Sequence, residues 1–177
     1  MKARILLSGS VLSVFCLLTA GVGALGHSAD VDGAAAFERM KALRGTWEAK
    51  TANGQKVTTT FELTANDTAL VERYTGSEAM SNAQMLTVYH LDGPALVLTH
   101  YCIAKNQPTL KAERFDPKTS EIQFEFVRAS NLANPNAGHM RRARYRIDDA
   151  NHFTTVWEFF QDGKKTMTEN ETFTRVR

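Results

Sequence analysis

The chain has 177 residues, and its 21 Lys and Arg residues exceed its 19 Asp and Glu residues by two, a formal net charge of +2. The first 29 residues hold two basic residues, Lys2 and Arg4, and no acidic one, so residues 30–177 are formally neutral. A neutral domain lacks the basic surface that nucleic-acid binding requires. Residues 30–177 are enough for one domain with a substantial buried core.

Residues 1–29 have the pattern of a removable signal peptide. A basic start is followed by an apolar stretch over 5–25 and then by small residues suited to cleavage. We therefore expect an exported protein, periplasmic or secreted, with no stable membrane insertion after cleavage. The alternative is an uncleaved membrane anchor, because the apolar stretch approaches the length that spans a bilayer.

The two cysteines predict no intramolecular disulfide. Cys16 leaves with the leader, so Cys102 is the only cysteine of the mature domain. We expect Cys102 to be a buried, inert thiol, and the alternatives are a reactive thiol or a metal ligand.

Residues 34–43 are rich in helix-forming residues, and Phe37 and Met40 share one stripe. This pattern predicts a short amphipathic helix. Gly45 follows where a C-terminal cap is expected, and Trp47 then begins the first strand.

From Trp47 onward the pattern has a period of two, and turn residues interrupt it at regular intervals. The expected strands start at Trp47 and then cover 57–63, 70–74, 85–91, 95–102, 110–115, 122–127, 139–147, 153–160 and 167–176. The fold predicted is an all-β, antiparallel up-and-down barrel of about ten strands, with a short N-terminal helix after the signal-peptide helix. The loop 129–138 is a candidate rim or lid.

The opening sequence Leu43-Arg44-Gly45-Thr46-Trp47-Glu48 resembles the lipocalin-like, or calycin, group of β-barrels. It is most similar to exported bacterial lipocalin-like proteins of unassigned function and, more weakly, to nitrobindin-like haem barrels. The resemblance implies that Gly45 and Trp47 are structural residues that close one end of the barrel. It also implies a small apolar ligand, or haem bound through a histidine.

The segment 98–108 holds the densest set of chemically capable side chains. Strand geometry places His100 and Cys102 on one face, where both could contact one ligand or metal ion. Tyr101 and Asn106 complete this candidate ligand-binding set. A metal site would need a third donor from another strand, for which His90, His139 and Glu158 are candidates, and the simpler interpretation is a hydrogen-bonded core histidine beside a buried cysteine.

Further candidates come from the second half of the chain. His139 ends the long loop and His152 follows a turn, so either could reach a barrel mouth, although solvated loop histidines are the simpler interpretation. Trp157 lies on a strand that is apolar on nearly both faces and is a ligand-binding candidate. Glu158 is expected on the outer face, paired with an arginine.

Three alternating arginines form the last pattern of this region. Arg142, Arg144 and Arg146 share one strand face with Arg141 opposite, which predicts a solvated outer face paired across strands rather than an anion-binding interior. The expected carboxylate partners are Glu121, Glu125, Glu169 and Glu171.

These observations favour an exported barrel that encloses a small, largely apolar molecule and has no catalytic residues. No cofactor is predicted. One alternative is a haem- or metal-binding barrel that uses His100, His139 or His152. A second is a hydrolase or isomerase with His100 as the base, assisted by Tyr101, Cys102 or Glu158, although no nucleophile motif supports it.

Overall fold

The computed structural model describes residues 31–51, 53–76 and 84–176. The predicted leader and its cleavage site lie outside the described residues. Within the described ranges, no helix has the length and apolarity that crossing a membrane requires.

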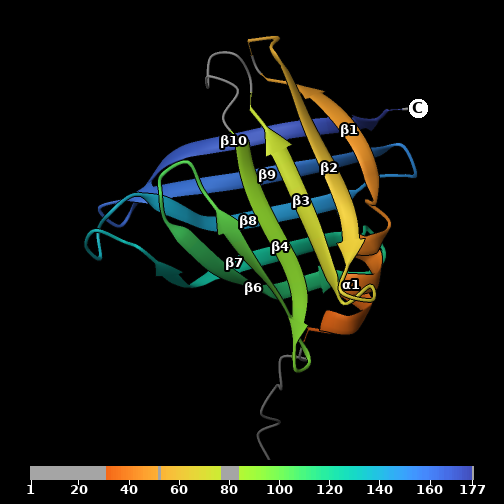
Figure 1. The fold of residues 1–177 in the computed structure, drawn as a ribbon, viewed down its shortest axis with the longest axis horizontal. Coiled ribbons are helices and arrows are strands. Elements are labelled where there is room, and N and C mark those ends of the chain that lie inside the picture. The colour runs from red at the N-terminus through yellow and green to blue at the C-terminus, as the bar shows by residue number, and fades with distance from the viewer. Residues whose placement is uncertain (1–30, 52, 77–83, 177) are drawn as a thin grey trace, which may run out of the picture.

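The described residues form one helix and ten strands, which confirms the predicted all-β fold (Figure 1). The elements are α1 (Gly33–Lys41), β1 (Gly45–Lys50), β2 (Lys56–Thr64), β3 (Ala69–Thr75), β4 (Gln84–Asp92), β5 (Ala95–Tyr101), β6 (Gln107–Asp116), β7 (Glu121–Ser130), β8 (His139–Ile147), β9 (His152–Gln161) and β10 (Lys164–Arg175). Each strand pairs antiparallel with the next along the chain, and β1 pairs with β10, so the sheet closes on itself. β1 and β10 pair at Trp47–Arg175 and Glu48–Thr174, so the two ends of the sheet meet over a short segment.

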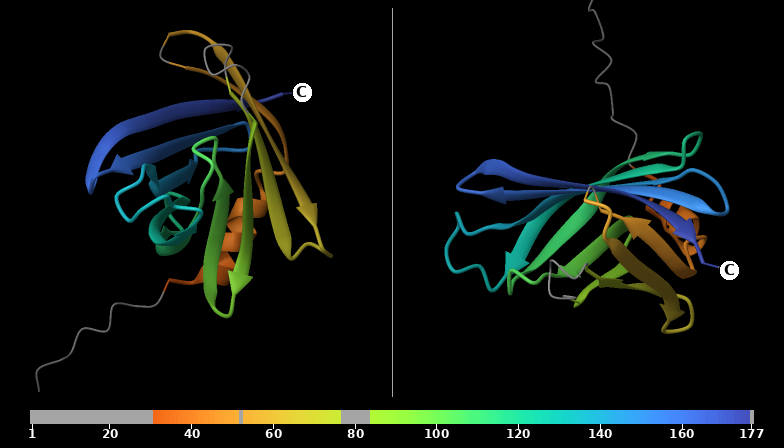
Figure 2. Two further views of the ribbon diagram at one scale, coloured as in Figure 1. Left: turned by 60° about the vertical axis from the view of Figure 1, so that its left-hand side comes forward. Right: turned by 90° about the horizontal axis from the view of Figure 1, so that it is seen from above.

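The helix covers one end of the barrel, which we call the helix end (Figures 1 and 2). It contacts β4, β5 and β6, and it buries Ala36, Phe37 and Met40. Its C-cap is Ala42 in a helical conformation, so the helix ends before Gly45, and Gly45 opens β1 instead of capping the helix. The positive φ of +124° at Gly45 explains why glycine is needed there.

Aromatic side chains fill the barrel next to the helix end. Trp47 is fully buried and meets Phe153 edge to face, with 4.8 Å between the ring centroids. Phe153 in turn stacks on Phe173 at 4.7 Å. Each fully buried ring of this size stabilises the fold by roughly 2 to 3 kcal/mol, so this layer forms a major part of the core.

Arg175, at the end of β10, connects this last strand to the segment between α1 and β1. Its guanidinium carbon lies 3.9 Å from the centroid of the Trp47 ring. The same group donates hydrogen bonds to the carbonyl oxygens of Ala42, Arg44 and Ala150 at 3.0, 2.7 and 2.8 Å. The guanidinium thus joins the segment after α1 to the turn between β8 and β9 and satisfies the carbonyl group of the helix C-cap, Ala42.

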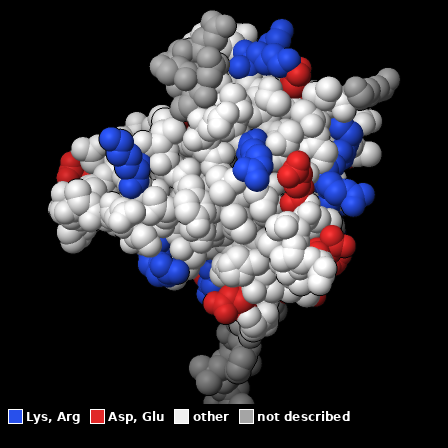
Figure 3. All heavy atoms as spheres, in the orientation of Figure 1, with Lys and Arg blue, Asp and Glu red and all other residues white. Residues whose placement is uncertain are grey.

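The arginines of β8 lie on the outer face as predicted, and their ion pairs confirm that interpretation. Arg142 contacts Glu125 at 3.0 Å and Glu158 at 3.5 Å. The other two pairs are Arg144 with Glu121 and Arg146 with Asp148. Basic and acidic residues are also interspersed on the face shown in Figure 3.

A bulge changes the expected place of Arg141. Strict alternation would turn Arg141 inward, but the pairing of β8 with β9 shifts register between Met140 and Arg142. Arg141 is therefore exposed like its neighbour, with its guanidinium over the rings of Phe126 and Phe160. The bulge keeps a cation out of the barrel while Met140 still points inward.

We predict that Arg175→Ala lowers the free energy of unfolding by about 2 to 4 kcal/mol, because charged hydrogen bonds to three carbonyl groups and the contact with Trp47 are lost. Urea unfolding of the purified protein, followed by tryptophan fluorescence, measures the change. Arg144→Ala, on the outer face, is the matched control and should change stability by less than about 0.5 kcal/mol. Equal effects of the two substitutions would contradict this role of Arg175.

Candidate functional site

A narrow cavity lies inside the barrel, beyond the aromatic layer. The centre of a water molecule can occupy about 20 Å³ of it, which is room for one water. Six strands contribute to its wall, because alternate residues of every strand point inward. The lining residues are Glu72, Tyr74, Met85, Thr87, His100, Met140, Thr155, Trp157, Glu169, Glu171 and Phe173.

A polar cluster forms one part of this wall. Glu72 is 5% exposed, and its Oε2 atom lies 2.6 Å from Tyr89 Oη and 3.0 Å from Tyr145 Oη. The two phenol oxygens lie 2.6 Å from each other, so the three oxygens form a triangle. The hydroxyl of Thr59 donates to Oε1 of Glu72 at 3.0 Å.

The triangle has three short contacts, but the two phenols supply only two protons. A third proton on Glu72 lets each oxygen donate once and accept once around the ring. Burial raises the pKa of Glu72, although the hydrogen bonds from Tyr89, Tyr145 and Thr59 act in the opposite direction. The oxygen geometry and the burial therefore both favour the protonated form of Glu72.

Glu171 on β10 is the second carboxyl group of the cavity. Tyr74 Oη donates to its Oε1 at 2.8 Å. Burial raises the pKa of Glu171 to about 7, and the negative charges of Glu169 and Glu72 act in the same direction while the Tyr74 hydrogen bond opposes them. Glu171 therefore changes charge near neutral pH.

Glu169 precedes Glu171 by two residues on the same inward face of β10. It is half-buried, and burial raises its pKa. In the described part of the chain it has no hydrogen bond or salt bridge. Among the described residues, the two neighbouring inward carboxyl groups thus have no basic partner, in contrast to the paired glutamates of the outer face.

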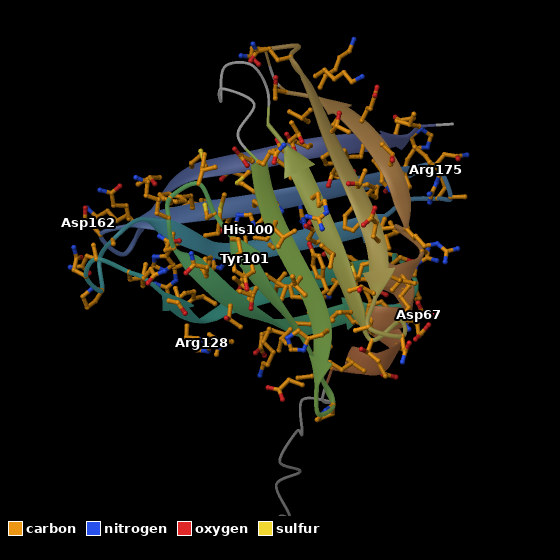
Figure 4. The ribbon with its side chains drawn as sticks, in the orientation of Figure 1. Asp67, His100, Tyr101, Arg128, Asp162 and Arg175 are labelled. Carbon is orange, nitrogen blue, oxygen red and sulfur yellow. The ribbon has the colours of Figure 1, made fainter. Side chains whose placement is uncertain are left out.

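His100 on β5 completes the polar wall, and Figure 4 shows it beside Tyr101 near the end of that strand. Its Nδ1 atom lies 2.9 Å from the hydroxyl oxygen of Thr87, and its ring packs on Trp157 with 4.8 Å between centroids. The Nε2 atom is buried and has no partner among the described residues. Burial lowers the pKa of His100 to about 4, so the ring is neutral at physiological pH.

The other predicted residues of the segment 98–108 do not line the cavity. Tyr101 is 47% exposed and points outward. Cys102 follows the end of β5 and is half-buried, and burial raises the pKa of its thiol, which disfavours a reactive thiolate. Asn106 is buried but donates from Nδ2 to the carbonyl oxygen of Gly138 at 2.8 Å.

The remaining histidine candidates also lie away from the cavity. His139 is buried and its Nδ1 contacts the carbonyl oxygen of Ala137 at 2.7 Å, while its ring packs on Phe126. His152 is exposed and pairs with Asp149 at 3.0 Å. Among the residues that the structure describes, no three His, Cys, Asp or Glu side chains are placed to hold a metal ion.

Glu158 lies on the outer face as expected. Its carboxylate contacts Lys165 at 2.8 Å and Arg142 at 3.5 Å, and the hydrogen bond from Lys165 is the main reason that its pKa is lowered. The prediction that Glu169 and Glu171 lie on this face was wrong. Both are in phase with buried Phe173 on β10, so they point into the barrel.

The sequence reasoning also missed the cluster around Glu72. Leu70, Glu72 and Tyr74 alternate on one face of β3, so a carboxyl group in phase with apolar residues was the signal that could have found it. The contacts of Glu72 with Tyr89 and Tyr145 join β3 to β4 and β8, and such long-range contacts have no local sequence pattern.

Comparison with known proteins gives a weak structural likeness. No family model matches the chain, and no curated protein matches it. A solved structure described as "Structure of EF1p2_mFAP2b bound to DFHBI" superimposes with a TM-score of 0.32 and 12% sequence identity, over 79% of this chain and 98% of the other. A likeness of this degree leaves the family and the ligand of the present chain open.

We predict that the free energy of unfolding of Glu171→Gln, relative to that of the wild type, increases by about 2 to 3 kcal/mol when the pH is raised from about 5 to about 8. The raised pKa means that the folded wild type keeps a proton that the unfolded chain has already released, so the stability of the wild type falls as the pH rises from the ordinary pKa of glutamate to about 7. His100 has the opposite effect below its ordinary pKa, but it is present in both proteins and cancels in the difference.

Urea unfolding at several pH values measures this difference. Glu158→Gln is the matched control, because its lowered pKa places its titration below the window. A constant difference between Glu171→Gln and the wild type across the window would contradict the buried position of Glu171.

Proposed function

We propose that this protein is an exported barrel that binds a small molecule in the cavity around His100 and Trp157. The observation that carries the proposal is the buried Nε2 atom of His100, which lines the cavity and lacks a hydrogen-bond partner among the described residues. A buried polar atom without a partner is costly, and a ligand or a trapped water would satisfy it.

The ligand we propose has a largely apolar body and at least one polar group. Met85, Met140, Trp157 and Phe173 supply apolar surface, and the opposite wall is polar. The cavity is too narrow for more than one water, so a larger ligand has to displace lining side chains. Methionine side chains change conformation at low energetic cost, so we expect Met85 and Met140 to move when the ligand binds.

The geometry gives less support to the two alternatives. Of the three histidines considered for haem, only His100 lines the cavity, and a porphyrin would require far more space than the cavity has. For a hydrolase or isomerase, the proposed assistants Tyr101, Cys102 and Glu158 lie outside the cavity wall.

We also propose that the protein belongs to the lipocalin-like group and that it is exported. The opening Gly45-Thr46-Trp47, the closed meander and the short helix that precedes the first strand all suit that group. The N-terminal pattern of a basic start and an apolar stretch suits a leader over residues 1–29.

The binding proposal predicts a ligand mass in native mass spectrometry of the protein purified from an exporting host, and this mass should disappear on denaturation. Nile red, a neutral apolar dye, should also bind with enhanced fluorescence. Met85→Trp, which fills the cavity, should weaken dye binding at least about tenfold, which is about 1.4 kcal/mol. Leu86→Trp, the outward neighbour on β4, is the matched control.

The export proposal predicts that expression of the full chain in a Gram-negative bacterium yields a periplasmic protein that begins near residue 30, within about three residues. Intact mass and N-terminal sequencing measure this. A version that starts with Met before residue 30 should stay in the cytoplasm. Recovery of the uncleaved 19.7 kDa chain from the membrane fraction would instead support the membrane anchor.

A further inference from the structure

The cavity wall is acidic, and in this it differs from the outer face, where acidic and basic residues form ion pairs. Its lining includes the carboxyl groups of Glu72, Glu169 and Glu171, and no Lys or Arg belongs to the lining. The basic residues of β8 are all directed outward, and the bulge at Met140 places even Arg141 outside. The described interior therefore offers no cation to the acidic groups.

Two of the carboxyl groups are open to a ligand. Glu72 is fully engaged by Thr59, Tyr89 and Tyr145. Glu171 receives one hydrogen bond, from Tyr74 to Oε1, which leaves Oε2 as a free acceptor in the described structure. Glu169 receives none from the described residues.

His100 is an independent sign of a ligand at the same place. It is 5% exposed, and its Nε2 atom is without a partner in the described structure. The Thr87 hydroxyl can accept from or donate to Nδ1, and we assign the tautomer in which Nδ1–H donates to it, so that Nε2 is an acceptor. The Nε2 atom of His100 on β5 and the carboxyl oxygens of Glu169 and Glu171 on β10 are then acceptors that line one cavity. A ligand that donates hydrogen bonds would satisfy them.

We propose that this cavity binds the protonated nitrogen of an organic cation, with the carboxylates of Glu169 and Glu171 and the Nε2 atom of His100 as acceptors and the ring of Trp157 as an apolar, cation-binding wall. This inference rests on the proposed binding function and names its ligand class. An ammonium group carries three N–H donors and no acceptor, which matches these three acceptors in number and type.

The physical chemistry of the wall distinguishes an organic cation from other ligands. An anion would meet two unpaired carboxylates in a desolvated space, which is repulsive. A metal ion would need a donor set that the described residues do not provide. The aromatic ring of Trp157 and the side chain of Met140 favour a cation with an apolar body, because a ring face attracts cations and both side chains bury carbon.

The test compares three probes of nearly equal size that differ in charge: 2-phenylethylammonium, 2-phenylethanol and phenylacetate. Calorimetric titration into the protein purified after expression of the full chain, at about pH 7.5, gives each affinity. We expect the ammonium probe to bind at least about tenfold more tightly than the alcohol and phenylacetate to bind more weakly than both.

Variants then locate the site. Glu171→Gln should reduce the preference for the ammonium probe over the alcohol to less than about threefold, because a charge-assisted hydrogen bond is replaced by a neutral one. Glu158→Gln, which removes an outer-face carboxylate, should leave the preference unchanged. The comparison of probes on the wild type needs no variant, so the proposal remains testable if Glu171→Gln fails to fold.

The outcomes distinguish the proposal of a cationic ligand from the broader proposal of a binding barrel. Equal affinity for the ammonium and alcohol probes, together with Nile red binding, would overturn the cationic ligand and leave the binding barrel intact. Absence of binding by every probe and by Nile red would overturn both. An ammonium preference that survives Glu171→Gln and Glu169→Gln would place the cation site elsewhere and overturn the assignment to this cavity.

Discussion

Pairing of β1 with β10 is the constraint on which the rest of the structure depends. Once the sheet is closed, alternate residues of each strand face a shared interior and the others face solvent, and only a bulge changes that assignment. Arg175 secures the closure from the side of β10, because its guanidinium covers Trp47 of β1 and binds carbonyl groups at the end of α1. Closure therefore decides which charges are desolvated.

The consequence is a separation of charge between the two faces of the sheet. On the outer face, Arg142 meets Glu125 and Glu158 in water, where such pairs form at little cost and contribute little stability. On the inner face, Glu171 and Glu169 have no cation among the described residues and respond by holding protons more tightly. Protonation removes the negative charge that a counter-ion would otherwise neutralise. A bound cation could replace the proton, so the site would favour a cation.

The architecture followed from the sequence because period-two patterning and regular turns are local signals. The ten strands, the short helix and the paired arginine face were all predictable from them. The site was less predictable. His100 and Trp157 were candidates on their chemistry, and both line the cavity. Cys102 was placed on the face of His100 by strand alternation, but β5 ends at Tyr101, and Tyr101 and Asn106 were included from the same segment. Glu169 and Glu171 were placed outside as possible partners of the β8 arginines, but β9 lies between β8 and β10, and the register with Phe173 was the stronger signal.

The triangle of Glu72, Tyr89 and Tyr145 explains why Glu72 differs from the other two acids of the cavity. Its hydrogen bonds join three strands, and a proton on Glu72 would let each of the three oxygens both donate and accept. Burial is the main cause that raises the pKa of Glu171 to about 7, and the nearby acidic groups act in the same direction. Glu171 therefore titrates near physiological pH. The triangle thus occupies the oxygens of Glu72 and leaves Glu169 and Glu171 as the cavity carboxyl groups with free oxygens among the described residues.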